Sequence, residues 1–181
     1  MSKDASGGDI FEPKRAGRDD LIVTPVSVRF QGRRFPRTVG RGGIVEAAQK
    51  VEGDGASPRG VHRIVGMLYR PDRVRRPADW AEPIGPNDLW SDDIQDPAYN
   101  SLVARPHPFS HEALRRSDPM YDIILVTDWN WPVATPGAGS AIFIHQWRGP
   151  GQPTAGCVAF RRDHLQWIAR RISVGTRVVI A

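Results

Sequence analysis

Residues 140–160 read SAIFIHQWRGPGQPTAGCVAF, in which two short apolar runs flank a loop rich in glycine and proline. The first run, 140–145, predicts a buried strand that ends at His145, and residues 158–160 predict a second. The glycines and prolines between the two strands allow the chain to fold back on itself. We therefore expect Cys157, the last residue of the loop, to lie near His145.

A cysteine beside a histidine is a pair of residues that can carry nucleophilic chemistry. A thiol becomes reactive when an imidazole accepts its proton, or shares it as a thiolate–imidazolium pair. Gly156 precedes the cysteine and lets a substrate carbonyl approach the backbone closely. The backbone N–H groups of Gly156 and Cys157 are candidates for stabilising an oxyanion.

Two other interpretations of Cys157 remain open from spacing alone. A single cysteine is one of the most frequently buried residues and usually only packs against its neighbours. A metal site formed by Cys157, His145 and His164 is the less favoured alternative, because these residues lack a recognised ligand spacing and a fourth partner. We predict no metal and no cofactor.

The rest of the sequence predicts a mainly β fold. Alternating or continuous apolar runs predict further strands at 21–30, 61–69, 121–129 and 176–180, and at 35–45 with a break at the glycines of 40–43. A helix is expected from about Asp163 to Ile172, with Asp163 as its N-terminal cap. Its buried face is formed by Leu165, Ile168, Ala169 and Ile172. Residues 52–60, which are rich in Gly, Pro and Asp, are expected to form a loop.

Residues 70–119 have a different character, because they are rich in Pro, Asp, Trp and Arg and show little periodicity. A segment of this length inside one domain usually has a function or covers the core. Its Trp and Tyr residues favour an ordered cover, because aromatic side chains offer large surfaces for burial. We expect one short helical turn in it, at 111–116, with His111 and Glu112 on a solvated face.

Composition limits the remaining possibilities. The chain has 181 residues, 25 Lys and Arg against 20 Asp and Glu, and a formal net charge of +5. Its single cysteine excludes an intrachain disulfide framework, a cysteine-rich zinc site and an iron–sulfur cluster. The positive charge is almost entirely arginine and is scattered along the chain. No sequence pattern of a nucleic-acid-binding fold is present, so we expect no nucleic-acid partner.

The length predicts one domain, which we place at 21–181 after a flexible tail at 1–20. The tail has no apolar run of seven residues, so as written it is not a secretory signal peptide, and no segment is long enough to span a membrane. The oligomeric state cannot be inferred from these features.

At the loop between His145 and Cys157 the sequence resembles the catalytic domain of the L,D-transpeptidases, also called the YkuD-type domain. In that family a strand ends in His, and Ser or Thr, any residue, Gly and Cys follow; here His145, Thr154, Gly156 and Cys157 fill these positions. The run KVEGDGASPRG at 50–60 matches a second stretch that is frequent in the family. The stretches DLWSDD (88–93), YN (99–100) and YDIILV (121–126) add to the resemblance.

The resemblance implies a β-sandwich-like fold and an enzyme that acts on peptidoglycan stem peptides. Cys157 would attack the carbonyl of a diaminopimelate residue and release the terminal D-alanine, with His145 as general base and then acid. The acyl group would pass to an amine, as in a transpeptidase, or to water, as in an L,D-carboxypeptidase. Gly156 would contribute to the oxyanion site. Thr154 would position the loop or bind substrate through its hydroxyl, and Trp147 and Arg161 would bind substrate.

The sequence departs from the family pattern in three ways, and two of them, Ala159 and the missing export signal, favour an alternative: a catalytically inactive peptidoglycan-binding or scaffolding module of the same fold. Ala159 occupies the position where many members carry Arg or Asn; Arg161 or Arg162 would have to substitute for that residue. The loop from His145 to Cys157 is short. The family implies a location in the cell envelope or periplasm, whereas the missing signal peptide leaves a cytoplasmic location open.

Other polar residues have simpler interpretations. Asp54 is expected to be a turn residue rather than a catalytic acid, and His164 is expected to be structural or exposed. Trp129, Trp131 and Trp147 are candidates either for a glycan-binding cleft or for the core.

Overall fold

A computed structural model describes residues 16–181 of the chain. Its largest element is a nine-stranded mixed sheet in which the order is β13–β12–β11–β6–β14–β1–β2–β3, with β7 paired to β6. Its strands are β1 (Leu21–Val23), β2 (Val28–Phe30), β3 (Arg33–Phe35), β6 (Gly60–Tyr69), β7 (Glu82–Pro83), β11 (Ile123–Thr127), β12 (Phe143–Gln146), β13 (Val158–Phe160) and β14 (Arg177–Ile180). Smaller sheets are formed by β4 (Ile44–Val45) with β5 (Ser57–Pro58), and by β8 (Asp88–Ser91) with β9 (Leu102–Ala104) and β10 (His111–Ala113).

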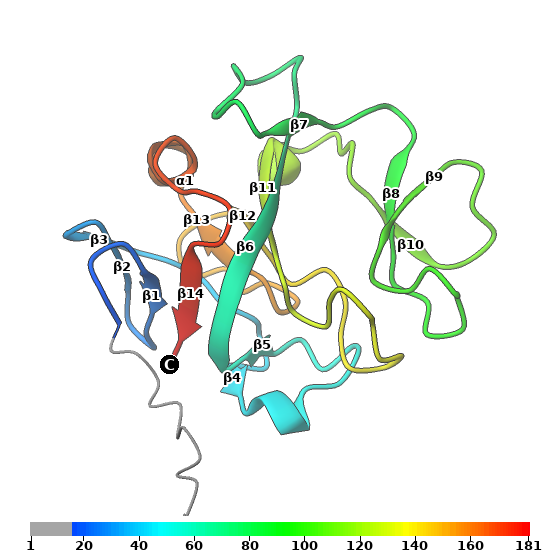
Figure 1. Cartoon of the computed structure of the whole chain (residues 1–181), viewed down its shortest axis with the longest axis horizontal. Coiled ribbons are helices and arrows are strands. Elements are labelled where there is room, and N and C mark those ends of the chain that lie inside the picture. Colours follow the sequence, from blue (N-terminus) through cyan, green and yellow to red (C-terminus); the bar gives the residue numbers. More distant parts are fainter. Residues whose placement is uncertain (1–15) are drawn as a thin grey trace, which may run out of the picture.

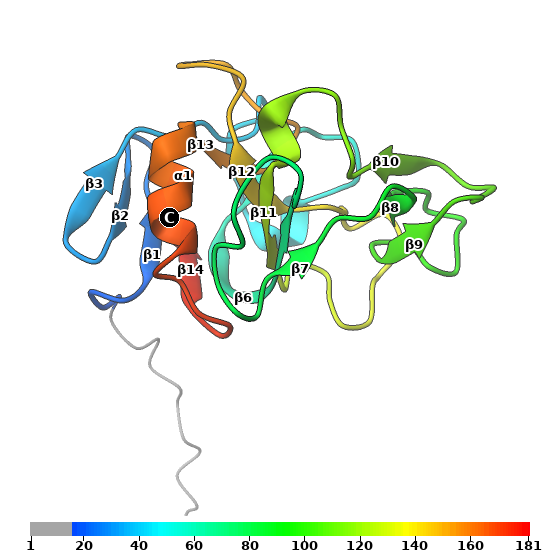
Figure 2. The same cartoon turned by 90° about the horizontal axis from the view of Figure 1, so that it is seen from above.

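The continuous apolar run of β11 explains how the layers are arranged. Ile123 and Leu125 belong to a core cluster shared with the single α-helix, α1 (Arg162–Ala169), whereas Ile124 and Val126 belong to a second cluster that includes Trp90 of β8. Because successive side chains of a strand point to opposite faces, β11 is covered on both sides. In Figures 1 and 2, α1 and the β8–β9–β10 sheet accordingly lie on opposite sides of β11.

The mainly β, sandwich-like fold predicted from the sequence is therefore confirmed, as is the small helical content. Two 3-10 turns, η1 (Ala47–Gln49) and η2 (Pro119–Tyr121), accompany the one α-helix. The predicted buried face is also confirmed for Leu165, Ile168 and Ala169, which are at most 2% exposed, but α1 ends at Ala169, so Ile172, which is also buried, lies after the helix. Asp163, however, is not the cap: Arg161 occupies the N-cap position, and Asp163 lies in the first turn, where its charge favours the helix N-terminus.

The prediction of one strand at 21–30 is wrong. Pro25 follows Thr24 at a turn, and β1 and β2 pair antiparallel across it, so Val26 is 84% exposed at the tip. The hydroxyl of Thr24 closes the turn by donating to the carbonyl of Ser27, 2.9 Å away. A proline lacks the N–H that a continuing strand needs.

The predicted strand at 35–45 is also wrong, because only its two ends belong to strands: β3 ends at Phe35 and β4 begins at Ile44. Between them, Thr38 and Gly40 form isolated bridges with Ala159 and Thr154. Residues 52–60 include the short strand β5, which pairs in parallel with β4.

Residues 70–119 do cover the sheet, but they are more regular than the sequence suggests. Strands β8, β9 and β10 form an antiparallel three-stranded sheet, which we call the cover sheet. The helical turn predicted at 111–116 is absent: His111 pairs with Ser91 and Glu112 with Trp90 as part of β10. This pairing joins residues about twenty positions apart, which local helix propensity does not reveal.

The ordered structure also extends a little before residue 21. The carbonyl of Arg18 accepts from the N–H of Gln31, and Asp20 forms an ion pair with Arg177 at 3.2 Å. The remainder of the tail predicted at 1–20, residues 1–15, lies outside the described residues. Among residues 16–181, no helix has the length and apolar character needed to cross a membrane.

Candidate active site

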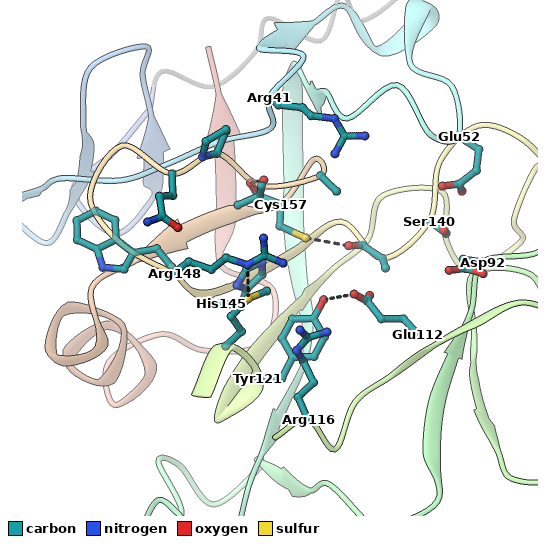
Figure 3. Close-up of a pocket in the computed structure, with 17 residues that line it drawn as sticks. Arg41, Glu52, Asp92, Glu112, Arg116, Tyr121, Ser140, His145, Arg148 and Cys157 are labelled. Carbon is teal, nitrogen blue, oxygen red and sulfur yellow. Dashed lines mark hydrogen bonds between the residues drawn. The ribbon is translucent and has the colours of Figure 1, made fainter. Parts of the chain in front are cut away.

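A cavity of about 570 Å³ opens between the main sheet, the cover sheet and the loop that precedes Cys157. Figure 3 shows the thiol of Cys157 near the middle of the lining residues, with His145 and Arg148 on one side and Glu52 and Asp92 on the other. The lining residues are Arg41, Glu52, Asp92, Glu112, Arg116, Met120, Tyr121, Ser140, Ala141, His145, Trp147, Arg148, Gln152, Pro153, Thr154, Ala155 and Cys157. The cavity thus contains Cys157, His145, Thr154 and Trp147, four of the residues predicted from the sequence.

Strands β12 and β13 bring His145 and Cys157 to this cavity. They pair in parallel, with His145 opposite Ala159, so Cys157 immediately precedes the strand that lies beside the histidine. Both residues are buried: Cys157 is 8% exposed and His145 is 3% exposed. The expectation that the loop folds back is confirmed by this pairing.

The resting thiol of Cys157 is held by two backbone groups. It donates to the carbonyl of Ala141 at 3.0 Å and accepts from the N–H of Phe143 at 3.3 Å. Burial, with a smaller contribution from the charge of Glu112, raises the pKa of Cys157 from 9.0 to about 12. The cysteine is therefore a neutral thiol near neutral pH.

The imidazole of His145 is neutral as well, because burial lowers its pKa from 6.5 to about 4. Its Nδ1 lies 2.8 Å from the carbonyl of Gln146. Only a protonated nitrogen can pair with a carbonyl oxygen, so Nδ1 carries the proton and Nε2 has a free lone pair. The ring packs edge-on against Tyr121, with 5.2 Å between the ring centroids. The histidine is thus prepared to accept a proton through Nε2.

The turn before Cys157 is held by close backbone contacts. The hydroxyl of Thr154 donates to the carbonyl of Cys157 at 2.6 Å and accepts from the N–H of Gly156 at 3.1 Å. Ser57, which is fully buried, donates to the carbonyl of Gly156 at 2.6 Å and accepts from the N–H of Gly40 at 3.0 Å. Gly156 has a φ of +140°, and an added Cβ there would lie 2.9 Å from the carbonyl oxygen of Ala56.

The run at 50–60 therefore serves as a support behind the cysteine loop. Asp54 accepts from the N–H groups of Val51 and Ala56 at 3.0 and 2.8 Å, and from the ammonium of Lys50 at 2.8 Å. These contacts lower the pKa of Asp54 against the opposing effect of burial, which is the largest single influence. Asp54 is the turn residue that the sequence predicts, and it does not line the cavity.

Gly40→Ala is expected to destabilise the protein by about 3 kcal/mol, at the upper end of typical overpacking costs. A Cβ at Gly40 would lie 2.1 Å from the backbone oxygen of Gly55 and 3.0 Å from Cα of Gly156, so one of the two loops has to move. Gly66→Ala is the matched control, because its nearest contacts, to Val126, are 3.6 Å or longer. Urea unfolding of both variants measures the difference, and equal stabilities would contradict the role of this close approach.

Sequence reasoning did not single out Glu112 and Tyr121 as parts of the site. The hydroxyl of Tyr121 donates to Oε1 of Glu112 at 2.8 Å, and the guanidinium of Arg116 lies 5.4 Å from the Tyr121 ring. Burial raises the pKa of Glu112, although the bond from Tyr121 opposes this rise. The solvated position predicted for Glu112 is therefore wrong, because β10 turns it toward Tyr121. His111 is half-buried, and its Nδ1 lies 2.7 Å from the carbonyl of Phe109.

Arg161 and Arg162 lie outside the cavity lining. Arg161 pairs with Asp163 at 2.6 Å, and Arg162 pairs with Asp122 at 3.1 Å. Ala159 is fully buried beside His145. The guanidinium groups that line the cavity instead belong to Arg41, Arg116 and Arg148. The hypothesis that Arg161 or Arg162 replaces the usual residue at 159 is therefore not supported by their positions.

The three tryptophans near the site differ in position. Trp147 lines the cavity. Trp129 donates from Nε1 to the carbonyl of Ala138 at 3.1 Å and packs edge-on against His62, whereas Trp131 is 51% exposed.

His164 is a half-buried residue whose ring packs against Phe35, in agreement with a structural role. Within residues 16–181, no group of three or more His, Cys, Asp or Glu side chains is arranged to hold a metal ion.

Comparison with known proteins identifies the class of domain. The YkuD family, described as the L,D-transpeptidase catalytic domain, matches residues 29–180, and the chain belongs to this family. Among solved structures, an L,D-transpeptidase from Mycobacterium smegmatis is similar with a TM-score of 0.41 and 12% sequence identity. That match covers 90% of this chain and 58% of the other, so this chain spans little more than half its length. No curated protein sequence matches the chain.

Proposed function

We propose that this protein is a cysteine-dependent L,D-transpeptidase or L,D-carboxypeptidase that acts on peptidoglycan stem peptides through an acyl-enzyme on Cys157. The observation that supports this proposal most directly is that a thiol and a neutral histidine with a free Nε2 line the same cavity. Membership of the family supplies the reaction class. Because stem peptides belong to the cell wall, the proposal implies a site of action in the cell envelope.

The neutral thiol and imidazole favour general-base catalysis over a preformed ion pair. As Sγ of Cys157 attacks the carbonyl carbon of the donor peptide, its proton passes to Nε2 of His145. The proton on Nδ1 stays on the imidazole, and its hydrogen bond to the carbonyl of Gln146 stabilises the imidazolium that forms. The imidazolium then protonates the nitrogen of the leaving D-alanine as the C–N bond breaks, leaving a thioester.

The second half of the reaction repeats these proton transfers in reverse. His145 accepts a proton from an incoming amine or water as that group attacks the thioester, and the thiol of Cys157 is restored. The N–H groups of Gly156 and Cys157 are proposed to stabilise the oxyanion in both halves. In the resting state the N–H of Gly156 bonds to Thr154, so the oxyanion would have to replace that hydroxyl.

The polar lining of the cavity suits a peptide that carries several charges. Thr154 and Trp147 are proposed to contact the donor stem, as their place in the lining allows. Arg41 and Arg148 offer guanidinium groups to stem carboxylates, with which Arg pairs through two parallel hydrogen bonds. Arg116 already pairs in this way with Asp118, at 2.6 Å. In this proposal Arg41 and Arg148 take over the part assigned from the sequence to Arg161.

Product analysis of purified disaccharide-tetrapeptides incubated with the protein tests the proposal. Release of D-alanine together with a cross-linked dimer is expected for a transpeptidase, and release with a disaccharide-tripeptide for a carboxypeptidase. Intact-mass measurement during turnover is expected to detect one acyl adduct. Binding of the tetrapeptide without release of D-alanine would instead support the inactive binding module and overturn the proposed chemistry.

A further inference from the structure

We propose that Asn100 is a positioning residue that aims the backbone carbonyl of Ala141 at the Cys157 thiol and so holds the resting nucleophile protonated and in one orientation. This inference deepens the proposed function, on which it rests for its meaning in catalysis. It concerns a residue of the β8–β9 connection in the cover sheet, which does not itself line the cavity.

Ala141, whose carbonyl accepts the hydrogen bond from the thiol, has an unusual backbone conformation. Ala141 has a φ of +51°, in the left-handed region that alanine seldom adopts. Such a conformation persists only where the surroundings impose it. The N–H of Ala141 donates to Oδ1 of Asn100 at 3.0 Å, and its carbonyl accepts from Sγ of Cys157 at 3.0 Å, the dashed line at Cys157 in Figure 3. One peptide segment thus joins Asn100 to the thiol.

The amide of Asn100 is itself fixed by four hydrogen bonds. Its Oδ1 accepts from Ala141 and also from Nε1 of Trp90 at 3.0 Å. Its Nδ2 donates to the carbonyls of Trp129 and Asn130 at 3.1 and 3.0 Å. Asn100 is 4% exposed, so these partners use its two donors and two acceptor positions without water. The amide has one orientation, which in turn determines the direction of the Ala141 N–H.

A second contact ties the same assembly to the thiol. Trp90 packs edge-on against Phe143, with 4.9 Å between ring centroids, and the N–H of Phe143 donates to Sγ of Cys157. Both backbone partners of the thiol therefore contact residues of the cover sheet: Ala141 contacts Asn100, and Phe143 contacts Trp90. A carbonyl acceptor stabilises the S–H form and not the thiolate. The arrangement keeps the proton on sulfur until a substrate draws the thiol toward His145.

Asn100→Gly tests this inference, with Asn130→Gly as the matched control. Both asparagines have a left-handed backbone, with φ of +57° and +53°, which glycine adopts without strain. Each amide donates to two backbone carbonyls of the segment around 129–139, but only Asn100 contacts Ala141. Both variants therefore remove an asparagine amide that bonds to the segment around 129–139. Only Asn100→Gly also removes the hydrogen bond to Ala141, the residue that contacts the thiol.

The single cysteine provides a readout that does not depend on catalysis, because the protein has one S–H stretching band. Asn100→Gly is expected to shift this band toward that of a weakly bonded thiol and to increase iodoacetamide alkylation of Cys157 at neutral pH by about tenfold, as for a thiol pKa lowered by one unit. Acyl transfer by this variant is expected to fall. Asn130→Gly is expected to leave the band and the pH profile of alkylation unchanged.

An unchanged S–H band and alkylation profile in folded Asn100→Gly would overturn the inference, as would equal changes in Asn130→Gly. Near-UV circular dichroism establishes that each variant is folded. If Asn100→Gly does not fold, Trp90→Phe, which removes one of the two donors to Oδ1 and retains a ring, should give a smaller shift in the same direction. A wild-type protein that shows the bonded S–H band but no acyl transfer would refute the proposed function and leave the positioning role intact.

Discussion

Cys157→Ala is expected to lower release of D-alanine from a disaccharide-tetrapeptide by about 10⁴-fold or more, as is typical when a covalent nucleophile is removed. No other thiol can take its place, because the chain contains no second cysteine. A carbapenem is expected to add one mass adduct to the wild-type protein and none to Cys157→Ala. Retention of either activity in Cys157→Ala would contradict the acyl-enzyme.

His145→Gln tests the role proposed for His145 separately from that proposed for Cys157. It is expected to lower turnover by about 10²–10⁴-fold, the usual contribution of general acid–base catalysis, while the thiol stays available to alkylating reagents. The matched control is His62→Gln: His62 is also buried and its Nε2 lies 3.1 Å from the carbonyl of Pro58, but it does not line the cavity. Equal losses of turnover in the two variants would show that His145 matters only for folding.

The free energy of unfolding is expected to be greatest between about pH 6.5 and 9 and to fall on both sides because of the two residues of the site. His145 has a pKa of about 4 in the folded protein against 6.5 ordinarily, so between these values the unfolded chain binds more protons. Stability therefore falls as the pH is lowered through this window, by about 1.4 kcal/mol per pH unit and about 3 kcal/mol in total. Burial also lowers the pKa of His62, which contributes to the same acidic limb.

On the alkaline side the sign is reversed. Cys157 has a pKa of about 12 in the folded protein against 9.0 ordinarily, so above pH 9 the unfolded chain loses its thiol proton first. Stability is complete below pH 9 and falls as the pH rises toward 12, again by about 1.4 kcal/mol per unit. Urea unfolding at a series of pH values measures both limbs.

Two substitutions test which residue causes the acidic decline in stability and which causes the alkaline decline. His145→Gln is expected to flatten part of the acidic limb and to leave the alkaline one unchanged, whereas Cys157→Ser should flatten the decline between pH 9 and 10. Tyr99 and Tyr121 contribute to the alkaline decline mainly above pH 10, because their pKa values are raised from 10.0 in the folded protein and only the unfolded chain loses these protons near pH 10. The raised pKa of Glu112 acts in the opposite direction in this window. An acidic decline of equal slope in the wild type and His145→Gln would therefore show that the imidazole of His145 is not buried in solution.

Much of the fold could be predicted from local patterns, because apolar periodicity and the positions of proline and glycine are local properties. Strand β6 and the buried face of α1 were predicted on this basis. The predicted strand at 21–30 was wrong where Pro25 places a turn inside an apolar run. The predicted helical turn at 111–116 was wrong because β10 exists only through its pairing with β8, whose residues lie about twenty positions earlier. Pairing of that kind is decided by tertiary contacts and not by propensity.

The same distinction applies to the candidate site. The sequence alone determined that there is one thiol, that a histidine lies in the preceding strand, and that the turn between them carries the family's Thr154, Gly156 and Cys157. Only the tertiary structure decided which groups surround that thiol. The carbonyl of Ala141, whose N–H donates to Asn100, accepts the hydrogen bond from the thiol, and Glu112 and Tyr121 from other elements line the same cavity. The physical reason is that burial, hydrogen-bond direction and pKa depend on contacts between distant segments, which residue spacing does not encode.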